Sequence, residues 1–245
     1  MKSCPLFALA SLLFAGPAMA VCNVPQPRLV CAEYFSSQVV VEATLVTTRT
    51  VPDKDNQEAA LGYFYKMRTN KLLRGDIAAQ FQIYEGNDSG RSTFEWKPGR
   101  KYLLFLFYAA DSKSWAVDGC GNSGPLAQAK PVLAQIEAIQ AHHDGGGVIH
   151  GVVRGTPSEL QGLRIVARGA NGRYTATPNA EGEFQIKVPP GQYTIHPRRS
   201  GLSFHTADFS YENPRNVRIE PGGCAQVQFE ASELTPPVPE QKLKQ

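Results

Sequence analysis

Short apolar runs alternate with turn residues along most of the chain, which is the pattern of a mainly β protein. Val39 to Thr50 is rich in β-branched residues and predicts a long first strand. Four further strands are predicted at 62–69, 77–83, 102–108 and 115–118. Clusters of Gly, Pro, Asp and Asn separate them, as at 86–90 and 98–99.

A helix is predicted after these strands, over Pro125 to His142, because its apolar residues recur at three- and four-residue spacing. Pro131 interrupts that pattern and predicts a kink or two short helices that share one face. Before the first strand, Cys31 to Ser37 could form one or two helical turns. Five strands followed by a helix favour a small five-stranded closed barrel of the OB type.

The run Asp144 to Gly147 marks a boundary, since three consecutive glycines do not hold a regular element together. Beyond it the pattern consists of short strands and turns only. Phe184, Ile186 and Val188 alternate with polar residues, the period of a half-buried strand. The candidate strands lie at 148–153, 163–168, 173–177, 184–188, 193–196 and 225–229. Their spacing predicts a roughly seven-stranded antiparallel β-sandwich.

The two ends of the chain carry different signals. Residues 1–20 have a short basic start, an apolar stretch and Ala18-Met19-Ala20, so they are predicted to be a secretory signal peptide cut before Val21. Residues 232–245 are rich in proline and charge and are predicted to be disordered. The predicted organisation is therefore a signal peptide (1–20), a barrel domain (21–143), a glycine linker (144–147), a sandwich domain (148–231) and a tail (232–245).

Charge and hydropathy restrict the partners. Removal of residues 1–20 leaves 24 basic and 22 acidic residues with the two signs mixed, which argues against a nucleic-acid partner. No later apolar run approaches the ~18 residues of a membrane-spanning helix, so no membrane insertion is expected. We expect an exported protein in the periplasm or the extracellular space.

Four cysteines remain after the predicted cut: Cys22, Cys31, Cys120 and Cys224. Cysteines of an exported chain are usually bonded, and their wide spacing argues against a compact tetrathiolate zinc site. We predict that Cys120 pairs with Cys22 or Cys31, and that Cys224 takes the remaining cysteine or stays free. All four are therefore candidates for disulfides.

Two further groups of residues contain side chains of metal-binding or nucleophilic type. His142, His143, Asp144 and His150 are suitable metal ligands by type, but glycines between them hold no geometry, so we interpret them as a polar helix end and linker. Ser89 and Ser123 lie near glycines without the G-x-S-x-G elbow of a nucleophile and are interpreted as turn residues. We predict no catalytic residue, no metal and no cofactor.

The first half contains V-V-V-E-A-T-L at 39–45, L-L-R-G at 72–75, P-G-R-K-Y-L-L-F at 98–105 and C-G-N-S-G-P-L at 120–126. In this order, over residues 22–143, these blocks resemble the netrin-like family that includes the tissue inhibitors of metalloproteinases. That resemblance implies an inhibitor whose first mature residue, a bonded Cys, chelates a protease zinc. Here Val21 precedes Cys22, and eight residues separate Cys22 from Cys31. We therefore expect these cysteines to be structural.

The second half contains I-H-G-V-V at 149–153, G-L-R-I-V-A at 162–167, T-P-N-A-E-G-E-F at 177–184 and V-P-P-G-Q-Y-T-I at 188–195. Over residues 147–231 it looks like a carboxypeptidase regulatory-like domain, which has a transthyretin-like sandwich. That resemblance implies an accessory, non-catalytic module.

Together these features predict an exported, non-catalytic binding or scaffolding protein that presents loops of two β domains to a protein or glycan. A netrin-like metalloprotease inhibitor, with a protease as partner, is the first alternative. A hydrolase with an unrecognised site is the second.

Overall fold

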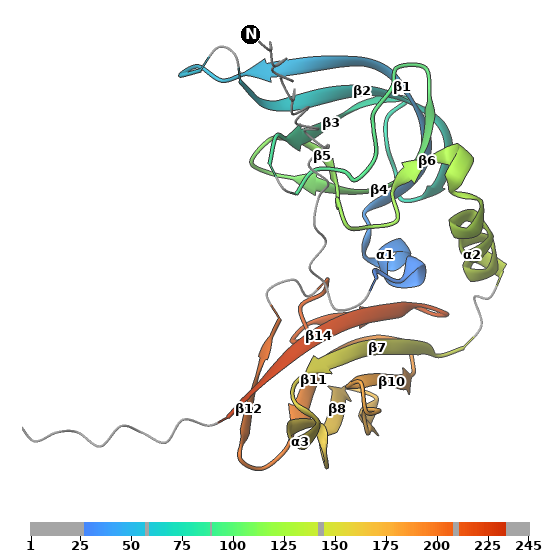
Figure 1. The fold of residues 1–245 in the computed structure, drawn as a ribbon. Coiled ribbons are helices and arrows are strands. Elements are labelled where there is room, and N and C mark those ends of the chain that lie inside the picture. Colours follow the sequence, from blue (N-terminus) through green and yellow to red (C-terminus); the bar gives the residue numbers. More distant parts are fainter. Residues whose placement is uncertain (1–26, 57–58, 89, 142–144, 208–210, 234–245) are drawn as a thin grey trace, which may run out of the picture.

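The computed structural model describes residues 27–56, 59–88, 90–141, 145–207 and 211–233 (Figure 1). The predicted signal peptide lies outside these residues, as does the predicted tail apart from Ser232 and Glu233, which belong to the last strand. In the described part of the chain, no helix has the length and apolarity needed to cross a membrane. The fold is mainly β, as the sequence predicts.

In the first half, five strands form one closed ring of strands. Their order is β1-β2-β3-β5-β4, and a second pairing between β1 and β4 closes the ring. All neighbours are antiparallel except β3 and β5. The strands are β1 (Val39–Pro52), β2 (Ala60–Arg74), β3 (Gln80–Gly86), β4 (Lys101–Ala109) and β5 (Ser114–Val117), with the short β6 (Gly124–Pro125) beside β4.

Strand β4 reads K-Y-L-L-F-L-F-Y-A and is buried on both faces at its centre. Tyr102, Leu104 and Leu106 point into the ring, where they join the core cluster of β1, β2 and β3. Leu103 and Phe105 point outward and are covered by helices. The continuous apolar run is therefore a strand between two apolar layers rather than a strand with one wet face.

Two helices cover that outer face: α1 (Val30–Ser36) and α2 (Lys130–Ala141). A 3-10 turn, η1 (Leu126–Gln128), precedes α2. Of the predicted alternatives, a kink or two short helices, the structure shows two helical pieces. The break falls at Ala129, and Pro131 is the second residue of α2, where a proline is tolerated. The predicted helical turn at Cys31 to Ser37 is confirmed as α1.

The second half has two four-stranded sheets with one apolar core between them. Their orders are β10-β7-β14-β12 and β13-β11-β8-β9. The strands are β7 (Gly147–Arg154), β8 (Arg164–Gly169), β9 (Gly172–Ala176), β10 (Glu183–Val188), β11 (Gly191–Arg198), β12 (Leu202–Thr206), β13 (Val217–Ile219) and β14 (Cys224–Glu233), with the short helix α3 (Pro157–Leu160) after β7.

This arrangement differs from the predicted seven-stranded antiparallel sandwich in two ways. The described residues contain eight strands, because β12 and β13 are short and carry too few apolar residues to give a clear alternation. In addition, β14 pairs with β7 in parallel, since the last strand returns beside the first one in the same direction. The remaining neighbours in both sheets are antiparallel.

Gly182 makes the turn before β10. It has a φ of +81°, and a Cβ there would lie 2.1 Å from the carbonyl oxygen of Val153. We expect Gly182→Ala to lower the free energy of unfolding by about 2 to 3 kcal/mol, the sum of left-handed strain and the clash. Gly201 has the same φ with no atom within 4 Å of its Cβ position. Gly201→Ala should therefore lower the free energy of unfolding by only about 1 kcal/mol, as measured in urea titrations. Equal losses in the two variants would show that the clash at Gly182 does not contribute.

Helix α1 lies between the ring and the second half, packed against β14 (Figure 1). A second contact joins the halves at Arg74, whose guanidinium lies 2.7 Å from the Glu220 carboxylate. The same guanidinium stacks on the rings of Tyr34 and Phe35. The Arg74 side chain is thus used in contacts inside the protein.

Candidate functional site

Three polar side chains stand in one row on the outer face of the sheet formed by β10, β7 and β14. Gln185, His150 and Gln226 are direct neighbours across the strands. Their chain neighbours, such as Ile149, Ile186 and Ala225, belong to the core between the two sheets. Since side chains alternate along a strand, the polar row faces away from this core. Helix α1 packs on β14 on this outer side.

Gln226 holds the chain segment that leads into α1. Its side-chain oxygen accepts a hydrogen bond from the Leu29 amide at 2.9 Å, and its side-chain nitrogen donates to the Pro27 carbonyl at 3.1 Å. Gln226 is fully buried. A buried amide that satisfies both a donor and an acceptor fixes the position of that backbone. Residues 27–29 are thereby held against the second half.

A disulfide between Cys31 and Cys224 links α1 to the start of β14, with a Cα–Cα distance of 5.8 Å. The half-buried Cys31 is thus bonded to the buried Cys224. Cys120 is also disulfide-bonded. The alternative that Cys120 pairs with Cys31 is wrong, because Cys31 is bonded to Cys224; the alternative partner, Cys22, lies outside the described residues. Cys224 is bonded to Cys31, which agrees with the alternative that Cys224 takes the cysteine that Cys120 leaves over.

A cleft of about 610 Å³ lies where segment 27–29 meets the second half, and we call it the junction cleft. One wall is Pro27 and Leu29. The other comes from β7, β10 and the turn before β10. The lining residues on that side are His150, Gly151, Thr177, Pro178, Asn179, Glu183, Phe184 and Gln185.

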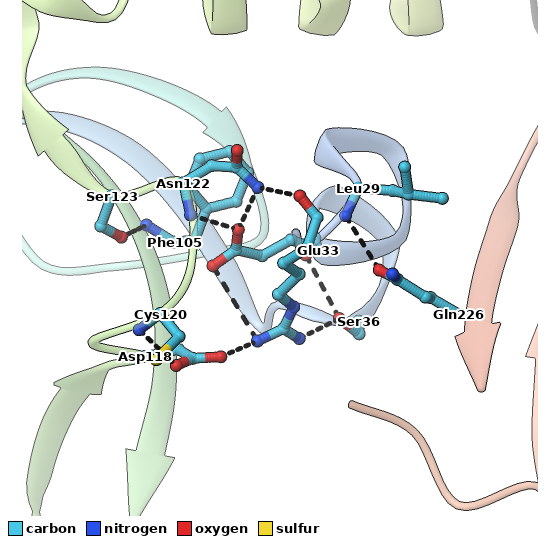
Figure 2. Close-up of polar contacts among 10 residues, drawn as sticks. Leu29, Glu33, Ser36, Phe105, Asp118, Cys120, Asn122, Ser123 and Gln226 are labelled. Carbon is cyan, nitrogen blue, oxygen red and sulfur yellow. Dashed lines mark hydrogen bonds and ion pairs between the residues drawn. The ribbon is translucent and has the colours of Figure 1, made fainter. Parts of the chain in front are cut away.

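A buried polar network fixes α1 on the ring side of the junction (Figure 2). Glu33 is only 1% exposed. Its carboxylate accepts hydrogen bonds from the backbone amide and side-chain nitrogen of Asn122, at 2.6 and 2.7 Å. Arg28 lies 4.0 Å from the same carboxylate and 2.5 Å from Asp118. Burial raises the pKa of Glu33, and Arg28 and Asn122 oppose that shift only in part.

The sequence at 120–124 is shaped by this network. A Cβ on Gly121 would lie 2.1 Å from the Glu33 carboxylate, so glycine leaves the space that the carboxylate fills. Ser123 accepts a hydrogen bond from the Phe105 amide at 2.9 Å. The interpretation of Ser123 as a structural turn residue agrees with this contact, while Ser89 lies outside the described residues.

Two further residues of the second half, Tyr211 and Glu212, contact Arg28 and Gln226 respectively. The Arg28 guanidinium lies 4.9 Å from the centre of the Tyr211 ring. Burial raises the pKa of Tyr211 to about 12. Burial also raises the pKa of Glu212 to about 7. A hydrogen bond from the backbone N–H of Gln226 to the Glu212 carboxylate, at 3.2 Å, opposes this shift.

Glu212 should make the stability of the protein depend on pH. Its pKa is higher in the folded chain than the usual 4.5, so ionisation favours unfolding. The free energy of unfolding should therefore fall as pH rises from about 4 to about 8, by roughly 2 to 3 kcal/mol from this group. Glu212→Gln should remove that part of the dependence in urea titrations, whereas Glu181→Gln, at an exposed position, should not. Identical pH profiles for both variants would contradict this assignment.

The structure also brings together three residues that sequence reasoning left apart. One ligand atom each of Cys31, His150 and Cys224 lies within 4.8 Å of the other two. Burial lowers the pKa of the half-buried His150. In the sequence His150 was grouped with His142, His143 and Asp144, which lie outside the described residues. The parallel pairing of β7 with β14 creates the actual cluster, and no local motif encodes that pairing.

No protein-family model matches the chain, and no curated protein matches it. The geometry of the junction cleft and of the residues around it is therefore the basis for the functional interpretation.

Proposed function

We propose that this chain is an exported, non-catalytic binding protein whose junction cleft receives part of a protein or glycan partner. The observation that carries the proposal is a cleft with walls from both halves of the chain, held by the Cys31–Cys224 disulfide and by Gln226. Binding sites often lie at such junctions. A wall that is fixed beforehand loses little conformational entropy when a ligand binds.

The lining of the cleft indicates the kind of ligand. Thr177, Asn179 and Gln185 supply neutral groups that donate and accept hydrogen bonds. Pro27 and Pro178 add apolar surface to the cleft. This mixture fits the hydroxyl groups of a glycan or the main chain of an extended peptide better than a strongly charged ligand.

The architecture of the two halves also supports the proposal of an exported binding protein. The closed five-stranded ring followed by α2 supports an OB-type barrel of the netrin-like kind for the first half. The two facing four-stranded sheets support a transthyretin-like sandwich for the second half. The disulfide supports an oxidising, exported environment.

One observation favours the hydrolase alternative: His150, Glu183 and Thr177 line the same cleft. These types can act as base, acid and nucleophile. The alternative of a metalloprotease inhibitor depends on Cys22, which lies outside the described residues. Turnover of ester, peptide or glycoside substrates that is lost in His150→Ala would replace the binding proposal by the hydrolase one.

The binding proposal is tested with a variant that fills the cleft. Gln185 is an exposed cleft residue on β10, so Gln185→Arg should obstruct the site without disturbing the core. Gln161→Arg is the matched control, because Gln161 is exposed and does not line the cleft. Glycan arrays and peptide arrays probed with the wild type should give a signal that Gln185→Arg loses by at least about tenfold, since each 1.4 kcal/mol corresponds to that factor. A signal that both variants keep would place binding elsewhere.

A further inference from the structure

We propose that Cys31, Cys224 and His150 form a binding site for a zinc-like cation when the Cys31–Cys224 disulfide is reduced. The disulfide is then one of two states of the same site. The inference rests on this cluster alone and does not depend on the ligand of the junction cleft.

The distances between the ligand atoms suit such a site. Two sulfurs and one imidazole nitrogen lie within 4.8 Å of one another. On a tetrahedral zinc with Zn–S bonds of about 2.3 Å and Zn–N bonds of about 2.0 Å, ligand atoms lie about 3.5 to 3.8 Å apart. The imidazole must therefore approach by about 1.3 Å or less, and the two sulfurs must separate from their bond. Side-chain rotation can provide movements of this size.

The ligand types also select the cation. Two thiolates with one imidazole favour zinc and other soft or borderline cations over magnesium or calcium, which prefer oxygen ligands. Three protein ligands leave a fourth position for water or a small anion. His150 lines the junction cleft, which offers the ion and that fourth ligand a path to the site.

The two states are related by a thiol exchange with a dithiol. The dithiol attacks the sulfur of Cys31, the less buried of the two cysteines, and two electrons and two protons pass to the protein. The Cys31–Cys224 bond breaks, both cysteines become thiols, and the dithiol closes into its own disulfide. Cation binding then forms two metal–sulfur bonds and one metal–nitrogen bond and releases the two thiol protons to water.

The helix α1 provides the fixed half of the site. Gln226 and the Glu33–Asn122 contacts hold α1 and its entry segment independently of the disulfide. Cys31 is thus expected to stay near β14 after reduction, so the ligand atoms remain close together. Without these contacts a reduced Cys31 would leave the neighbourhood of His150.

The test compares the oxidised full chain with the chain reduced by a phosphine, using Zn²⁺ in equilibrium dialysis and Co²⁺ as a spectroscopic probe. We expect the reduced chain to bind Zn²⁺ and to show sulfur-to-cobalt charge-transfer absorption, and the oxidised chain to show neither. His150→Ala should weaken Zn²⁺ binding to the reduced chain by at least about tenfold, because even indirect partners of zinc ligands are worth about 10- to 100-fold. His196→Ala, exposed on the other sheet, should bind like the wild type.

Phosphine also reduces the disulfide of Cys120. Cys120→Ser should therefore keep the cobalt absorption, whereas Cys31→Ser should lose it. The proposal is overturned if reduction adds no Zn²⁺ binding, if His150→Ala binds as tightly as the wild type, or if Cys120→Ser abolishes the cobalt signal while Cys31→Ser retains it.

Discussion

Replacement of both Cys31 and Cys224 by serine should lower the free energy of unfolding by up to about 5 kcal/mol. The cross-link joins residues 193 positions apart. In the chain-entropy description of a disulfide, closing a loop of this length removes about 5 kcal/mol of freedom from the unfolded chain. Urea unfolding followed by tryptophan fluorescence and by far-ultraviolet circular dichroism measures the loss.

A matched variant separates the cross-link from local packing. Cys224 is buried, so a serine there also buries a hydroxyl group. Cys31→Ala/Cys224→Ala removes the same cross-link without that group and should lose a similar amount of stability. A loss below about 1 kcal/mol in the alanine pair would show that contacts around α1, rather than the covalent link, hold the halves together.

The second large effect is expected at Glu33. Glu33→Ala leaves the backbone amide of Asn122 without its acceptor and removes one of the two acceptors of the Asn122 side-chain nitrogen, which keeps the Arg28 carbonyl. It also removes the carboxylate beside Arg28, in a site that is only 1% exposed at Glu33. Breaking a buried charged contact from one side typically costs about 3 to 5 kcal/mol. We expect a loss of that order in urea unfolding, with weaker protection of the α1 amides in hydrogen exchange.

Glu33→Gln is the informative comparison, because its amide oxygen can still accept from Asn122. Its deficit should be smaller than that of Glu33→Ala. The deficit should also narrow as pH rises above the ordinary carboxyl value of 4.5, because the raised pKa of Glu33 makes its ionised form costly in the folded chain. If the two variants lose the same stability at every pH, the Asn122 contacts contribute nothing beyond filling space.

Local pattern was sufficient to predict most of the strands. The β-branched run of β1 corresponds to a strand that is buried on both faces, and the alternation of Phe184, Ile186 and Val188 to a strand with one face in the core. Pro131 marked the start of α2 because proline fits only the first turn of a helix. Strand β13 was missed because three residues with one arginine give no detectable period.

The junction could not be predicted in the same way. Leu29 and Gln226 are 197 positions apart, and four cysteines permit three pairings that spacing alone does not distinguish. The stretch Cys31 to Ser37 predicted a helical turn, but a carboxylate such as Glu33 is normally exposed, so its burial was not foreseen. The resemblance to two families describes each half separately and contains no information on the contact between them.

The path of mechanical tension through the molecule follows from the Cys31–Cys224 link. If the chain is pulled at residues 28 and 233, force passes from α1 directly to β14 through the sulfur bridge. The ring and the strands from β7 to β13 lie within the loop that the bridge closes, so they carry no tension along their backbone. The load is carried by the bridge and by β14 itself, which is already extended, whereas its parallel partner β7 lies off the load path. An oxidised molecule stretched between these two points would keep its ring of strands intact for as long as the Cys31–Cys224 bond holds.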